Sequence, residues 1–124
     1  DRPSIRLIAA NAEKLPLADA SYDIVTAIFL FHELPAPVRR KVAHEMARVL
    51  KPGGLLVFLD SAQYGDVPGW DGALESFPHR FHEPYYQNYL EDDLDGLFSA
   101  AGLLPHEQRA VLLSKMMVRR KAMP

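Results

Sequence analysis

His32 and Glu33 directly follow an apolar run that extends from Tyr22 to Phe31. An imidazole, with an ordinary pKa of about 6.5, can take up or release a proton near neutral pH. If the run is a central strand, its carboxyl end lies where open α/β sheets bind their ligands. We therefore predict that His32 and Glu33 are catalytic, with His32 as a general base or a substrate contact. The alternative is a histidine that only caps the end of the strand.

A second group of polar and aromatic side chains occupies the long segment between Ser61 and Asn88: His79, Arg80, His82, Glu83, Tyr85 and Tyr86. Two histidines three residues apart, with a glutamate nearby, could hold a metal ion. Pro78 and Pro84 bracket them, however, and argue against a regular helix that presents both rings. We therefore predict no metal site. Asp60 and Gln63 are expected to point toward the same edge as His32.

The elements that must position these residues follow from the apolar pattern. Residues 22–31 are nearly continuous in apolar residues and residues 55–59 are fully apolar, which predicts central parallel strands that are covered on both faces. Between them, Val38, Val42, Met46, Val49 and Leu50 form one stripe of a helix, and its polar side is assigned to Arg39, Arg40, Lys41, Glu45 and Arg48. Lys51-Pro52-Gly53-Gly54 ends this helix. The two strands and the helix between them are therefore expected to form a βαβ unit with a right-handed crossover.

The remaining segments complete a single α/β domain over residues 1–124. Ile5–Ala9 reads as a short strand, and residues 61–88 as a long loop or a set of short helices. A helix is predicted over Leu90–Ala101, with Glu91, Asp92 and Asp93 in its first turn and Gly102 at its end. Two antiparallel strands, 103–109 and 111–120, then form a hairpin.

Composition excludes several classes of protein. The chain has 124 residues, of which 48% are hydrophobic and 24% charged, as in an ordinary globular domain. A net charge of −2 provides no broad positive field for nucleic acid. The absence of cysteine excludes disulfides and thiolate chemistry, and it fits a cytoplasmic location. No apolar run approaches the ~20 residues that span a bilayer, so no membrane partner is expected.

Three segments, taken in order, resemble the middle of a class I S-adenosylmethionine-dependent methyltransferase: 11–17 (Asn-Ala-Glu-Lys-Leu-Pro-Leu), 21–25 (Ser-Tyr-Asp-Ile-Val) and 47–54 (Ala-Arg-Val-Leu-Lys-Pro-Gly-Gly). In that family the sheet order is 3-2-1-4-5-7-6, with strand 7 antiparallel. The element order here is similar to the C-terminal two-thirds of that fold. The resemblance implies a Rossmann-like parallel sheet with a C-terminal antiparallel hairpin, lacking the first two strands.

The resemblance also implies a function and a set of contacts. The implied function is methyl transfer from S-adenosylmethionine to a small-molecule acceptor, and the alternative is a non-catalytic Rossmann-like binding or oligomerisation module. Asn11 stands where the family commonly has an aspartate that meets the adenine amino group. Predicted cofactor contacts are Asn11, Ala12, Glu13, Phe29 and Leu30, and predicted acceptor contacts are His82, Tyr85 and Tyr86.

The family's glycine-rich cofactor loop and ribose-binding acid would precede residue 1. We therefore expect these residues to belong to a longer parent chain and to be inactive alone. Without the first two strands, the strand at residues 22–31 would expose an apolar edge. Either the 5–9 strand moves beside it, or two chains pair as a homodimer, which a size-exclusion mass measurement would detect.

Overall fold

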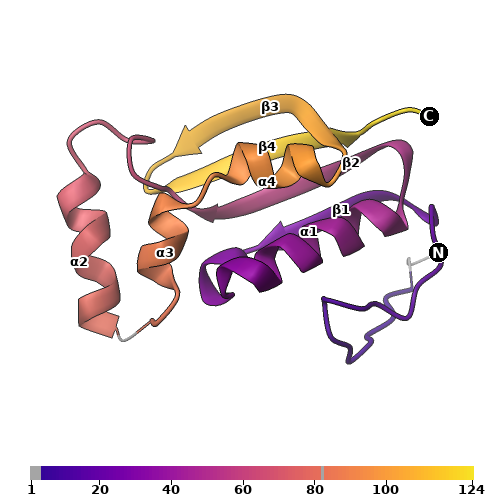
Figure 1. Cartoon of the computed structure of the whole chain (residues 1–124), viewed down its shortest axis with the longest axis horizontal. Helices are drawn as coiled ribbons and strands as arrows, with labels where there is room; N and C mark the ends of the chain where they lie inside the picture. The colour runs from indigo at the N-terminus through magenta and orange to yellow at the C-terminus, as the bar shows by residue number, and fades with distance from the viewer. Residues whose placement is uncertain (1–3, 82) are drawn as a thin grey trace.

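The computed structural model describes residues 4–81 and 83–124. Figure 1 shows the elements in chain order: β1 (Tyr22–Ile28), a 3₁₀ turn (Phe31–Glu33), α1 (Ala36–Val49), β2 (Leu50–Ser61), α2 (Asp71–Phe81), α3 (Tyr86–Glu91), α4 (Leu94–Ala100), β3 (Leu103–Val111) and β4 (Ser114–Lys121). Within the described ranges, no helix combines the length and apolarity that a bilayer crossing requires.

The strands form one sheet in the order β1-β2-β4-β3. β1 and β2 run parallel, with Ala27 opposite Phe58, and β4 is antiparallel to both β2 and β3. The two apolar runs therefore lie side by side in the same direction, joined through α1 as predicted. The hairpin prediction is also confirmed, although its turn is at Leu112 and Leu113 rather than at residue 110.

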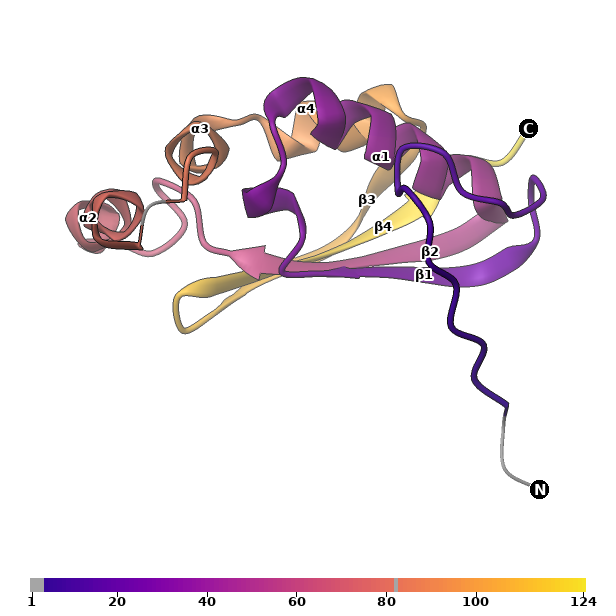
Figure 2. The ribbon, with the colours of Figure 1, turned by 90° about the horizontal axis from the view of Figure 1, so that it is seen from below.

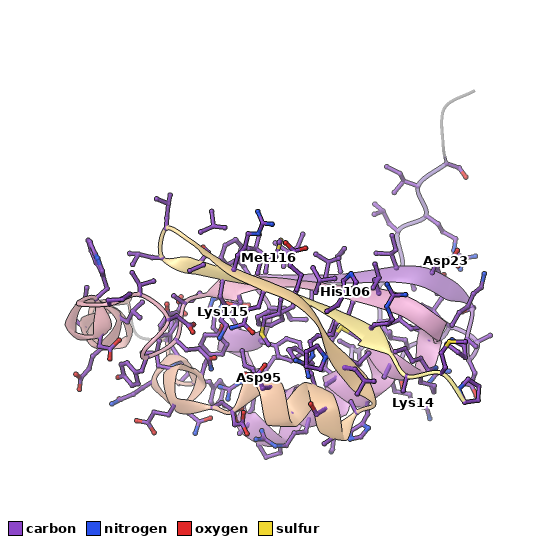
Figure 3. The ribbon with its side chains drawn as sticks, turned by 90° about the horizontal axis from the view of Figure 1, so that it is seen from above. Lys14, Asp23, Asp95, His106, Lys115 and Met116 are labelled. Atoms are coloured by element: carbon purple, nitrogen blue, oxygen red, sulfur yellow. The ribbon has the colours of Figure 1, made fainter. Side chains whose placement is uncertain are left out.

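All four helices lie on one side of the sheet or beyond its end, as Figure 2 shows. Leu56 and Phe58 of β2 are fully buried beneath them, whereas Leu55, Val57 and Leu59 alternate with these residues and are only half-buried. Figure 3 shows the same alternation on β4, where Lys115 points to the helical side and Met116 to the opposite face. The expectation that both faces are covered is therefore wrong for the described residues.

An aromatic cluster holds the helical layer onto the sheet. The ring of Phe31, just after β1, lies edge-on to Phe58 of β2, with the ring centroids 5.3 Å apart. Phe98 of α4 lies 5.7 Å from Phe31 and 5.4 Å from Phe58, and all three side chains are fully buried. This packing fixes the position of the turn that follows β1, which carries His32.

The predicted strand at Ile5–Ala9 does not form. These residues have no regular structure, and the side chains of Ile5 and Leu7 are 87% and 92% exposed. A strand needs hydrogen bonds to a neighbour, and this segment extends away from the sheet (Figure 2). The predicted move beside β1 is therefore wrong. β1 is an edge strand of the sheet, as expected, and Ile24 and Ile28 on its uncovered face are more than half exposed. Pairing through this edge in a homodimer stays a prediction.

The predicted helix over Leu90–Ala101 is two helices, because the chain breaks at Asp92 and Asp93. Asp93 is the N-cap of α4, where its carboxylate accepts a hydrogen bond from the Gly96 N–H at 2.9 Å. Asp92 instead binds two arginines of α1. In the preceding segment, α2 continues through Pro78, contrary to our expectation. Pro78 is beyond the first turn of α2, so the helix lacks the hydrogen bond that this N–H would have donated to the preceding turn.

Candidate functional site

A strained backbone residue directs the chain from β1 to His32. Phe29 has a φ of 50°, a left-handed conformation that costs a bulky residue about 1–2 kcal/mol. Its N–H still donates to the carbonyl of Leu59 at 2.8 Å, so the residue is held at the end of the parallel pair. The chain then turns over the carboxyl edge of the sheet and enters the 3₁₀ turn at Phe31–Glu33.

Asp60, the buried residue near the end of β2, holds this turn with its carboxylate. One oxygen, Oδ2, accepts from the backbone N–H of Phe31 at 2.9 Å, and Oδ1 accepts from the N–H of Ser61 at 2.7 Å. Oδ1 also lies 2.7 Å from Nδ1 of His32. Since a carboxylate only accepts, we assign the Nδ1 proton to His32, which leaves Nε2 as the basic nitrogen of the neutral ring.

Nε2 of His32 faces two further carboxylates. Oε2 of Glu83 lies 3.5 Å away and Oε1 of Glu33 lies 3.9 Å away. Among the described residues, Oε2 of Glu83 is buried and has no hydrogen-bond partner, because 3.5 Å to the ring nitrogen does not give an adequate geometry. Unpaired buried acceptors are rare and costly. A bound molecule with an O–H group could donate to Glu83 or to Nε2.

The surroundings raise the pKa of His32 above 6.5. The main cause is the hydrogen bond to Asp60, and the charges of Asp60, Glu83 and Glu33 act in the same direction, while burial opposes them. The charged ring is thus stabilised by the fold. The corresponding contribution to stability is fully present below about pH 6.5 and is lost as pH rises through the higher pKa of the folded state.

NMR titration of the His32 ring protons should therefore give a midpoint above pH 6.5. Asp60→Asn removes the charged acceptor, so the midpoint should fall. A wild-type midpoint below 6.5 for His32, or no change in the variant, would contradict the proposed Asp60 contact.

His32 borders a largely apolar cavity of about 270 Å³, which we call the reaction cavity. Its lining comes from the end of β1, the end of β2, α2, the start of α3 and the β3–β4 turn: Phe29, His32, Ser61, Ala73, Leu74, Glu83, Tyr86, Leu113 and Ser114. Tyr86 lies edge-on to His32 at 5.4 Å, and its hydroxyl shares a hydrogen bond with Oγ of Ser61. The cavity suits a small apolar molecule that presents one polar group to His32.

Arg39 of α1 joins the His32 turn to α3. Its side chain is fully buried, and Nε donates to the carbonyl of Phe31 at 3.0 Å. Its two terminal nitrogens donate to the carbonyl of Tyr85 at 2.9 Å, to Asn88 at 2.8 Å and to the carboxylate of Asp92 at 2.9 Å. The assignment of Arg39 to the polar side of the helix is therefore wrong.

The predicted site residues fall into three groups. His32 and Tyr86 both line the reaction cavity. Glu33 and Tyr85 line a smaller neighbouring cavity of about 210 Å³ together with His32, although the Glu33 side chain is 64% exposed. His82 lies outside the described residues. The described residues also contain no group of three or more His, Cys, Asp or Glu side chains placed to hold a metal.

The predicted cofactor contacts occupy two separate places along α1. Asn11, Ala12 and Glu13 form a tight turn, in which Oδ1 of Asn11 accepts from the Glu13 N–H at 2.9 Å. Glu13 lies 3.8 Å from Lys41 near the middle of α1. Phe29 and Leu30 instead precede the start of α1, where Phe29 is 47% exposed and Leu30 packs against the core.

Sequence reasoning placed Asp60 at the correct edge but missed its bond to His32. It missed Ser61 and Leu113 as lining residues. Gln63, two residues after β2, is buried, and its amide donates to the carbonyls of Tyr89 and Asp92. Ser61 could have been predicted as a lining residue, because it is at the carboxyl end of β2, where such sheets bind ligands. The position of Leu113 depends on where the hairpin lies in the sheet, and no local pattern encodes that position.

Comparison with known proteins identifies relatives of the chain. Residues 1–58 match the family described as methyltransferase domain. Over 90 residues the chain is 39% identical to a demethylmenaquinone methyltransferase of Listeria welshimeri, covering 73% of this chain and 36% of that protein. It is 40% identical over 76 residues to a ubiquinone/menaquinone biosynthesis C-methyltransferase of Methylobacterium nodulans, covering 61% and 29%. The aligned part thus spans about a third of the length of these relatives.

Solved structures show the same fold. A methyltransferase from Methanosarcina mazei that depends on S-adenosylmethionine superposes with a TM-score of 0.69 at 19% identity, covering 93% of this chain and 66% of that one. One from Aquifex aeolicus gives a TM-score of 0.64 at 21% identity, covering 94% and 55%. At these identities the likeness establishes the arrangement of the elements. The sheet order β1-β2-β4-β3 corresponds to strands 4-5-7-6 of the expected order.

Proposed function

Because the chain belongs to the class I S-adenosylmethionine-dependent methyltransferase family, we propose that its protein transfers a methyl group from S-adenosylmethionine to a small-molecule acceptor. The observation that carries the proposal is the His32–Asp60 pair at the rim of the reaction cavity, with a 2.7 Å hydrogen bond. This pair is at the carboxyl edge of the sheet, where the family fold binds ligands.

In this proposal His32 acts as the general base. Asp60 keeps the proton on Nδ1, so that Nε2 accepts the proton of an acidic O–H or C–H group on the acceptor. The positive charge that forms on the ring is stabilised by Asp60, Glu83 and Glu33, which all raise the pKa of His32. The apolar walls of the reaction cavity exclude water and orient the acceptor.

The cofactor residues present fit part of S-adenosylmethionine. The Asn11 side chain is exposed, and its Oδ1 retains a second lone pair that could accept a hydrogen bond from the adenine amino group. Glu13 orients this amide by accepting from Nδ2 at 3.3 Å. Phe29 and Leu30 would lie beside the methionine chain. When bound, the cofactor supplies the electrophilic methyl group.

The acceptor that this site favours is small, largely apolar and mildly acidic at the reacting group. The relatives named for menaquinone and ubiquinone biosynthesis support a quinol-like ring. A cytoplasmic location and the absence of nucleic-acid and membrane partners stay predictions from the composition.

An assay with labelled S-adenosylmethionine tests the proposed function. The full protein that carries these residues should transfer label to demethylmenaquinol or a related hydroquinone and release one S-adenosylhomocysteine per methylated product. Calorimetric titration with S-adenosylmethionine is the companion measurement. A full protein that releases no heat with the cofactor and labels no acceptor would contradict the enzyme assignment.

A further inference from the structure

Two charged side chains of α1 bind the chain that follows the predicted cofactor turn. Residues 11–14 form that turn, in which the Lys14 N–H donates to the Asn11 carbonyl at 3.0 Å. Residues 15–19, which we call the connection, then pass beside α1 (Figure 1). Glu45 and Arg48, which lie one helical turn apart on α1, bind the connection, and we call this pair the clamp.

Both backbone polar groups of Leu15 are bound by the clamp. Oε1 of Glu45 accepts from the Leu15 N–H at 2.7 Å, and Nη2 of Arg48 donates to the Leu15 carbonyl at 3.2 Å. Nη1 of Arg48 also donates to the Leu17 carbonyl at 2.8 Å and to the Asp19 carboxylate at 2.6 Å. Three residues of the connection are thus bound to two side chains of one helix.

The two side chains of the clamp also fix each other. Nε of Arg48 donates to Oε2 of Glu45 at 2.9 Å, and Nη2 donates to Oε1 at 2.7 Å, which makes the pair bidentate. Mainly through these hydrogen bonds, Arg48 lowers the pKa of Glu45 to about 2, so the carboxylate is charged near neutral pH. The bidentate geometry restricts both side chains, and the connection therefore meets partners in fixed positions.

Apolar packing contributes little to the position of the connection. The structure describes all of residues 11–20, and none of these is fully buried or part of a helix or strand. An open hollow of about 530 Å³ is lined by residues 14–18 together with Glu45 and Arg48. A segment with little burial and no sheet pairing opens at low cost. The clamp is therefore the main restraint on the start of the connection.

We propose that Glu45 and Arg48 are positioning residues for the cofactor, which hold the Asn11 turn, through Leu15, in the conformation that accepts adenine. The inference rests on the proposed function and adds to it two residues outside the predicted cofactor contacts. Leu15 directly follows Lys14, which closes the turn, so a displaced Leu15 also displaces the turn. Without the clamp, fewer molecules have a competent turn, and the apparent affinity for the cofactor falls by the same fraction.

Hydrogen exchange of single amides, in the full protein that carries these residues, tests the clamp without any cofactor. In Glu45→Ala the Leu15 N–H should exchange about tenfold faster or more, the equivalent of a lost hydrogen bond. In Arg48→Met it should also exchange faster, because Glu45 loses the partner that orients it. An unchanged Leu15 rate in both variants would overturn the proposal.

Ser21 is the internal reference for the exchange measurement. Its N–H donates to the backbone carbonyl of Val49 at 2.9 Å, a bond that neither substitution removes. Its rate should therefore stay the same while that of Leu15 rises. Equal acceleration of both amides would indicate a general loss of stability and would overturn the clamp as a local restraint.

Calorimetric titration with S-adenosylhomocysteine tests the positioning role. The Kd should rise about tenfold in Glu45→Ala and in Arg48→Met, as the fraction of competent turns falls. Glu45→Gln keeps an oxygen that can accept from the Leu15 N–H, so it should recover part of the affinity that Glu45→Ala loses. Arg40→Met, the same change in the first half of α1, is the matched control and should keep the wild-type Kd.

Steady-state kinetics of labelled methyl transfer should show the same division. In Arg48→Met the KM for S-adenosylmethionine should rise, while kcat at saturating cofactor should stay within about twofold, because the clamp acts on binding and not on the reacting groups. A lower kcat with an unchanged KM would overturn the positioning role.

The outcomes also separate this inference from the proposed function. A wild-type protein that binds S-adenosylhomocysteine, with the same Kd in both clamp variants, would overturn the positioning role and leave the proposed function in place. A wild-type protein that binds no S-adenosylhomocysteine would overturn both. Faster Leu15 exchange together with weaker binding in both variants, and neither change in Arg40→Met, would support the proposal.

Discussion

Replacing Arg39 with methionine is expected to lower the free energy of unfolding by about 3 kcal/mol or more, the usual cost of removing one partner of a buried ion pair. The guanidinium donates to the carbonyls of Phe31 and Tyr85 and to the carboxylate of Asp92. Methionine fills a similar volume but donates nothing, so two carbonyls lose a donor in a buried setting. Urea unfolding followed by circular dichroism measures the loss.

Arg40→Met is the matched control for this prediction. Arg40 belongs to the same helix and binds the same carboxylate of Asp92 at 2.8 Å, but its side chain is 47% exposed. Exposed ion pairs contribute at most about 1 kcal/mol, so the loss should be within that range. An equal loss of stability in both variants would contradict the buried contacts of Arg39 that join the His32 turn to α3.

The burial of Arg39 was readable from the helix pattern. It precedes Val42 by three residues and Met46 by seven, so it lies on the same stripe as the apolar residues. The polar character of arginine outweighed this spacing in the prediction. An arginine on an apolar stripe needs acceptors in the neighbouring layer. Those acceptors come from residues 31, 85, 88 and 92, and no local pattern shows that these segments meet.

The central part of the fold was predictable because its signals are local. The two apolar runs and the stripe of α1 together specify a parallel pair with a crossover helix. The predicted turn at Lys51–Gly54 is instead the first part of β2, where the register with β1 shifts. Gly54 shows how tightly this part is packed, since a Cβ there would lie 2.9 Å from the carbonyl of Asp23. The failed strand at 5–9 had an equally good local pattern. It lacked a neighbouring strand, and that is a property of the whole sheet.

The candidate site divides in the same way. His32 was predictable because the end of an apolar strand can be located in the sequence. Its bond to Asp60 required that two strands lie in a particular register, with Ile28 opposite Leu59. The reaction cavity required the β3–β4 turn to lie beside α2, as the lining residues Leu113 and Leu74 show. Residues at the ends of strands are thus accessible to sequence reasoning, whereas contacts between loops are not.

Replacing His32 with alanine should lower the rate of methyl transfer by about 10²- to 10⁴-fold, the usual contribution of a general base. The measurement is kcat for labelled methyl transfer by the full protein that carries these residues. Glu33→Gln is the matched control. The Glu33 side chain is 64% exposed and 3.9 Å from Nε2, so its loss should change kcat by less than about fivefold, the equivalent of an exposed ion pair.

Asp60→Asn distinguishes a base from a histidine that only packs against the cavity. Asparagine has a similar shape, but without the carboxylate charge the pKa of His32 loses its main upward cause. A general base works only when it is unprotonated, so the rising limb of the pH–rate profile should move to lower pH. The plateau rate should fall, because a base of lower pKa is weaker. A packing role would lower the plateau and leave the limb in place. An unmoved limb, or a fully active His32→Ala protein, would remove His32 from the chemistry.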